Sequence, residues 1–86
     1  MKPDRLYERV KQGHKHNVRF ADFVALMEAF GFEHTRTKGS HNWYVHETGQ
    51  VRMSVQPDRN GNAKAYQIAD FLKYVAEHAL SMKERE

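Results

Sequence analysis

The spacing of the apolar residues changes at Gly31, and this change most constrains the fold. Before the glycine, apolar residues recur at i, i+3, i+4, i+7 and i+10, which predicts one face of an amphipathic helix. These residues are Phe20, Phe23, Val24, Met27 and Phe30. From Phe32 to Gln56 the chain instead has short runs of β-branched and aromatic residues. Two turn-forming stretches, residues 38–40 and 47–50, divide these runs into three antiparallel strands.

Further helices are expected on either side of this segment. Pro3 suits a first helical turn and Gly13 a C-terminal stop, so residues 1–16 should be a short basic helix, Pro3 to Gln12, and its linker. Near the other end, apolar residues at helical spacing predict a last helix. They are Ile68, Phe71, Leu72, Val75, Ala76 and Ala79. The polar tail, residues 81–86, is expected to fray.

The sheet is expected to have one buried face and one wet face. In the third strand, apolar and polar residues alternate from Val51 to Gln56, as a half-buried antiparallel strand requires. The predicted architecture is a two-layer α+β fold, with helices on one face of a three-stranded antiparallel sheet, in the order α-α-β-β-β-α. For the second strand the register is open by one residue, because either Trp43 or Tyr44 can face the core. The provisional choice places Tyr44 inward with Asn42 and His46, and leaves His41 and Trp43 on the open face.

Length and composition exclude several classes of protein. The 86 residues suit a single small domain, 1–86, that buries roughly 60–65% of its unfolded surface, so a large pocket is not expected. The chain has no cysteine, which excludes disulfides and thiolate zinc sites. No apolar run approaches the roughly 18 residues of a membrane span. We therefore expect a cytoplasmic protein that uses neither a membrane nor a small-molecule cofactor.

The charge is modest overall but uneven along the chain. The net charge is +3, and the first 19 residues hold six of the 14 basic residues against two of the 11 acidic ones. Such an asymmetry permits contact with nucleic acid or with an acidic protein. A solvated amphipathic helix explains it equally well.

Six histidines raise the question of a metal site. A zinc site needs three or four ligands, and neither His14 with His16 nor His41 with His46 has an obvious third ligand. His41 and His46 are five residues apart, so on one strand they point to opposite faces. We therefore expect no metal.

The stretch from Lys38 to His41 is the strongest candidate site. Gly39 lets the backbone approach a ligand, the Gly39 and Ser40 N–H groups and the Ser40 hydroxyl can donate to an anion, and Lys38 adds positive charge. Histidine exchanges protons near neutral pH, so His41 suits removal of the proton of a ribose 2′-hydroxyl. Read from spacing alone, the same residues are a hairpin turn with an exposed histidine. Trp43 is read in the same way, as a packing residue or as a stacking surface for bases.

Several stretches together resemble the HicA family of toxins from toxin-antitoxin pairs. They are NVRFADFVALMEAFGF, RTKGSHNWYVH, MSVQP and GNAKAYQIADFLKYV, and the resemblance covers about residues 17–77. It implies a fold similar to the double-stranded RNA-binding domain. It also implies a ribonuclease that acts on translated mRNA until a cognate HicB antitoxin covers the active site.

The resemblance assigns roles to particular residues. His41 matches the catalytic histidine of the family, Gly39 and Ser40 the residues before it, and Lys38 a position where a basic or small residue is usual. With Lys64, at the start of the last helix, Lys38, Gly39 and Ser40 are the candidates for binding RNA phosphates.

The chain departs from the family pattern at three positions. Many relatives have a second histidine where this chain has Asn42, some have a histidine at the position of Asp58, and those with the AK-YQ motif usually have proline at Ala65. The first departure leaves His41 as the one evident proton-transfer residue.

Three functions follow from the sequence. The first is a metal-independent mRNA endoribonuclease toxin, neutralised by a HicB-like antitoxin that binds around Lys38 and His41. The second is a non-catalytic RNA-binding module of the same fold, and the third is a small adaptor for another protein. The basic first helix is either a packing element or an additional contact to RNA or antitoxin.

Overall fold

The predicted order of elements is confirmed. A computed structural model describes residues 1–83 of the chain. The elements are α1 (Pro3–Lys11), α2 (Phe20–Ala29), β1 (Phe32–Lys38), β2 (His41–His46), β3 (Arg52–Val55) and α3 (Ala65–Glu77). The strands form one antiparallel sheet in the order β1-β2-β3.

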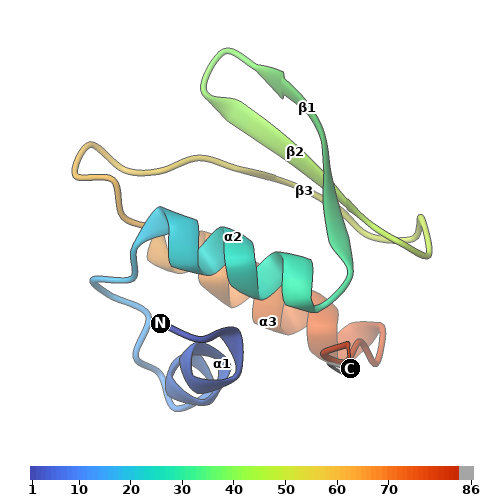
Figure 1. Ribbon diagram of the computed structural model, residues 1–86, viewed down its shortest axis with the longest axis horizontal. Helices are drawn as coiled ribbons and strands as arrows, with labels where there is room; N and C mark the ends of the chain where they lie inside the picture. The colour runs from blue at the N-terminus through green and yellow to red at the C-terminus, as the bar shows by residue number, and fades with distance from the viewer. Residues whose placement is uncertain (84–86) are drawn as a thin grey trace.

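The helices all lie on one side of the sheet, as expected for a two-layer α+β fold. In Figure 1, α2 and α3 run side by side beneath the sheet and leave its opposite face open. The core between the layers is centred on Phe71, whose ring packs at centroid distances of 5.9 Å from Phe23, 5.3 Å from Phe30 and 6.0 Å from Phe32. Aromatic pairs of this kind each add about 0.5–1.5 kcal/mol beyond area burial. Side chains from α2, β1 and α3 therefore pack together in this cluster.

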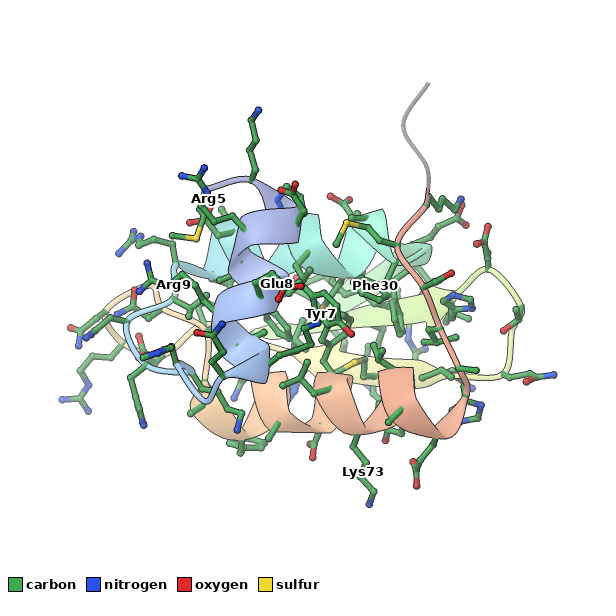
Figure 2. The ribbon with its side chains drawn as sticks, turned by 90° about the horizontal axis from the view of Figure 1, so that it is seen from below. Arg5, Tyr7, Glu8, Arg9, Phe30 and Lys73 are labelled. Carbon is green, nitrogen blue, oxygen red and sulfur yellow. The ribbon has the colours of Figure 1, made fainter. Side chains whose placement is uncertain are left out.

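Helix α1 packs on the helix layer, on the side away from the sheet. It buries Leu6 and Val10, and its Tyr7 ring meets Phe30 edge-on at 4.9 Å. Figure 2 views the molecule from this side, with α1 in front and Arg5 and Arg9 projecting from it. The helix ends at Lys11, one residue before the expected end. Its basic side chains are therefore far from the open face of the sheet.

The register of β2 agrees with the provisional choice of faces. Tyr44 and His46 are buried, whereas His41 is exposed and Trp43 is half-buried. Burial raises the pKa of the Tyr44 hydroxyl, and the charge of Glu28 adds to this effect. Across the ladder Tyr44 pairs with Met53, whose side chain is also buried. His41 and Trp43 thus face away from the helices.

A bulge at Thr35 changes which side chains of β1 share this open face. His34 pairs with Tyr44 and Arg36 pairs with Trp43, so Thr35 is an extra residue on the β1 side. Without the bulge, simple alternation from Phe32 would direct Arg36 and Lys38 toward the helices. With it, Arg36 lies opposite Trp43 and Lys38 opposite His41. The bulge therefore gathers two basic residues of β1 on the face that carries His41.

The C-terminal segment differs from the expectation in two respects. Ile68, Phe71 and Val75 are buried as predicted, but Ala76, in the last turn of α3, and Ala79, beyond the end of α3 at Glu77, are exposed. The tail was expected to fray from residue 81. Instead, Lys83 donates its N–H to the Ala29 carbonyl at 2.8 Å, and its ammonium lies 2.9 Å from Glu47. The rest of that tail, residues 84–86, lies outside the described residues.

Across residues 1–83, none of the helices combines the length and apolar character needed to cross a bilayer.

Candidate active site

The candidate site begins at the tight turn between β1 and β2. Lys38 and His41 are paired across the ladder, so Gly39 and Ser40 form a two-residue loop. Gly39 has a φ of +62°, as the first central residue of a type II′ hairpin turn requires. A Cβ added at Gly39 would meet no atom within 4 Å, so the glycine is needed for its backbone conformation and not for space. The turn holds Lys38 and His41 at adjacent positions on the open face.

The His41 ring is held on one side and open on the other. Its Nδ1 lies 3.2 Å from the hydroxyl of Ser54, which is on the neighbouring strand β3. Within the described part of the chain, Nε2 has no hydrogen-bond partner and the side chain is exposed. The arrangement leaves one ring nitrogen free to exchange a proton with a bound molecule.

The polar groups of the turn divide into engaged and free donors. The Ser40 hydroxyl donates to the side-chain carbonyl of Gln56 at 2.8 Å, so it braces the turn against the end of β3. The N–H groups of Gly39 and Ser40 donate to no other group in residues 1–83. Lys38 is exposed and forms no ion pair in the same range. Two amides and one ammonium can therefore receive an anion, while the serine hydroxyl already has a role in the fold.

Lys64 lies outside this turn, at the start of α3. It is the N-cap residue of α3, and it follows Ala63, which bridges to Pro57 beyond the end of β3. Its charge helps to lower the pKa of Asp58, although the larger cause is the hydrogen bond from the Asn62 N–H to that carboxylate. Within residues 1–83 no hydrogen bond or ion pair joins Lys64 to His41. Four of the five predicted residues are brought together, and Lys64 belongs to a neighbouring loop.

Three side chains of the open face were not among the predicted site residues. The Trp43 ring has the Arg36 guanidinium 5.7 Å from its centroid and the Arg52 guanidinium at 5.8 Å. The alternation in β3 already placed Arg52 on the wet face. Arg36 could not be found in this way, because the bulge at Thr35 reverses its expected side.

Asn42 faces the other side of the sheet from His41. Its amide nitrogen donates to the Val55 carbonyl at 3.2 Å, and its oxygen accepts from the Thr37 hydroxyl at 3.0 Å. The residue that stands where many relatives have a second histidine thus joins all three strands. It is not positioned to share a proton transfer with His41.

His46, at the other end of β2, has a structural role. The Thr48 N–H donates to its Nδ1 at 3.2 Å, so Nε2 carries the proton and donates to the Phe30 carbonyl at 2.8 Å. It is buried and ties the end of α2 to the turn after β2. No group of three or more histidine, aspartate or glutamate side chains in residues 1–83 could hold a metal ion.

These features define a small α+β domain with an accessible histidine among basic side chains on an open sheet. A family model described as HicA toxin of bacterial toxin-antitoxin systems matches residues 20–75, from the start of α2 into α3. The chain belongs to this family, as its motifs predicted. It is thus a member of a toxin family, and its partner in such a pair is an antitoxin. Neither the curated proteins nor the solved structures gave a match.

Proposed function

We propose that this toxin is a metal-independent endoribonuclease that cleaves mRNA in the cytoplasm, with His41 as the proton-transfer residue. The observation that carries the proposal is the His41 ring, which Ser54 orients through Nδ1 and which presents Nε2 to solvent beside free anion donors. The nucleophile is in the substrate, because the 2′-hydroxyl of RNA adjoins the phosphate that it attacks. No metal-bound water is needed for this reaction.

The reaction is a transesterification at phosphorus. His41 Nε2 takes the proton of the 2′-hydroxyl, the 2′-oxygen bonds to phosphorus, and the bond from phosphorus to the 5′-oxygen breaks. The 5′-oxygen leaves with a proton, which gives a 2′,3′-cyclic phosphate and a 5′-hydroxyl end. In this scheme water or the Lys38 ammonium supplies that proton, since Asn42 faces away from His41.

The turn supplies the phosphate contacts. The free N–H groups of Gly39 and Ser40 and the Lys38 ammonium would bind the non-bridging oxygens, where negative charge grows as the new bond forms. The Ser40 hydroxyl contributes by keeping the turn against Gln56. Lys64, at the start of α3, would contact a phosphate farther along the strand. A HicB-like antitoxin would neutralise the toxin by covering Lys38 to His41.

Removal of the catalytic imidazole tests the proposal. Purified His41→Ala should lose cleavage of mRNA by about 10²–10⁴-fold in EDTA, and its expression should no longer arrest growth. The matched control is His14→Ala, because His14 is exposed in the linker after α1 and forms no side-chain hydrogen bond in residues 1–83. Circular dichroism should show both variants folded. Undiminished toxicity of folded His41→Ala would exclude the mechanism.

A non-catalytic RNA-binding module is the second candidate. The observation that favours it is that the turn carries one histidine, since Asn42 is occupied in the sheet and offers no second acid or base. This function requires RNA binding with no product formation during long incubation at high protein concentration. A single gel that separates RNA fragments therefore distinguishes the two candidate functions.

A further inference from the structure

The open face of the sheet carries an aromatic ring with two guanidinium groups over it. Trp43 lies half-buried between Arg36 and Arg52, and both arginines are exposed. Neither guanidinium forms an ion pair or a hydrogen bond within residues 1–83. A tryptophan needed only for packing would be expected on the helix side, where Tyr44 lies. The open face is therefore a candidate binding surface.

The charge of the face is strongly one-sided. Arg36, Lys38 and Arg52 are its basic residues, and Glu33 is the one carboxylate on the three strands. Glu33 pairs with Val45, two positions beyond Trp43 and four beyond His41 along β2. The surface from His41 to Trp43 therefore has three positive charges and suits a polyanion.

The geometry points to an unpaired segment of RNA. Paired bases keep their faces inside the helix, so duplex RNA is contacted through its minor groove and backbone. A half-buried tryptophan at the surface of a sheet, flanked by arginines, can instead stack on a single base, while the guanidinium groups contact the adjacent phosphates. His41 and Trp43 are two residues apart on one face of β2, about 7 Å along the strand. A base stacked on Trp43 would thus adjoin the nucleotide that His41 acts on.

We propose that the open face, formed by Arg36, Trp43 and Arg52, is a stacking site for single-stranded RNA that holds the nucleotide next to the scissile phosphate. The proposal rests on the endoribonuclease function and gives its substrate class, which is unpaired segments of mRNA. Because stacking tolerates every base, this site would supply affinity and register with modest sequence preference.

Trp43 is the only tryptophan of the chain, so its fluorescence reports on this face alone. The probe is a short single-stranded 2′-O-methyl oligoribonucleotide, which has no free 2′-hydroxyl and cannot be cleaved. Titration into the wild-type protein should quench Trp43 fluorescence with a saturable curve. Arg36→Gln and Arg52→Gln should each weaken binding several-fold and lower the slope of log affinity against log salt by about 0.7.

The matched control is Arg5→Gln, because Arg5 is exposed on α1 on the opposite side of the molecule (Figure 2). It should bind the oligonucleotide as the wild type does. Trp43→Leu removes the fluorescent reporter, so its binding is followed by the anisotropy of a labelled oligonucleotide. A loss of about tenfold is expected from the stacking lost with one base. Thermal melting of each variant shows whether it is folded.

Three results would overturn the proposal. The first is equal binding by Arg36→Gln, Arg52→Gln and Arg5→Gln. The second is equal affinity for a duplex of the same sequence, and the third is equal quenching by poly-glutamate, which would show attraction to any polyanion, including an acidic protein. The experiment is independent of catalysis. If the wild-type protein binds the oligonucleotide but does not cleave RNA, the nuclease function alone is refuted. If Arg36→Gln, Arg52→Gln and Trp43→Leu cleave RNA as well as the wild type does, and this cleavage requires His41, the present inference alone is refuted.

Discussion

His41 and His46 occupy the two ends of β2 and show how the two faces of one sheet give the same side chain different roles. His46 lies on the covered face, where it is 6% exposed and both ring nitrogens have partners. His41 lies on the open face, where only Nδ1 has a partner. A histidine held at both nitrogens can stabilise a fold but cannot exchange protons with a substrate. The odd spacing of five residues places these two side chains on opposite faces.

The largest expected difference is in stability. His46→Ala leaves the buried Phe30 carbonyl without its partner, which costs about 1–3 kcal/mol, and it also removes the acceptor of the partly buried Thr48 N–H. His41→Ala removes an exposed ring with one side-chain partner, so its free energy of unfolding should change by about 0.5 kcal/mol or less. Urea denaturation measures both. Equal destabilisation by the two substitutions would contradict the division of roles.

The turns at the two ends of the sheet provide a smaller contrast. Gly31 and Gly39 both have positive φ, so alanine is strained at either position. At Gly39 the new Cβ meets no atom within 4 Å, and the cost should be the backbone strain alone, about 1–3 kcal/mol. At Gly31 it would lie 2.6 Å from Glu47 Oε2 and 3.1 Å from His46 Nε2. Gly31→Ala should therefore have the lower melting temperature, and the reverse order would show that the covered side can adjust.

Deletion of Thr35 is expected to have the smallest effect on RNA binding and cleavage. Without this residue the ladder becomes regular, and the pairs Arg36 with Trp43 and Lys38 with His41 are kept. The deletion loses the hydrogen bond from the Thr35 hydroxyl to the Trp43 carbonyl, which is worth about 1 kcal/mol. Oligonucleotide binding and cleavage should stay within a few-fold of wild type. A large loss of binding with the fold intact would mean that the curvature of the bulge itself shapes the site.

The parts of the structure that depend on neighbouring residues were predictable from the sequence. The α2 stripe, the alternation in β3 and the turn at Gly39 and Ser40 follow from local spacing and turn chemistry. The bulge at Thr35 was not predictable, because nothing in the order of polar residues in β1 distinguishes a bulge from a regular strand. Consequently Arg36 could not be assigned to the site from sequence alone.

The sequence also did not predict contacts between residues that are far apart along the chain. Gln67 is buried, and its side-chain oxygen accepts a hydrogen bond from the Gln56 N–H. This bond connects the end of β3 to α3. Lys83 is held by Ala29 and Glu47, both far away in sequence. The role of His41 was suggested by the family motif, and the geometry adds what surrounds it: an orienting serine, two free amides and a basic open face.

The central claim is tested most directly by the ends of the RNA fragments that the proposed nuclease would release in EDTA. Wild-type protein is incubated with a defined mRNA, and the fragment ends are analysed by enzymatic labelling and mass spectrometry. The account predicts fragments with 2′,3′-cyclic phosphate and 5′-hydroxyl ends, which are absent with folded His41→Ala. Fragments with 5′-phosphate ends, or cleavage only after addition of a divalent metal, would contradict it.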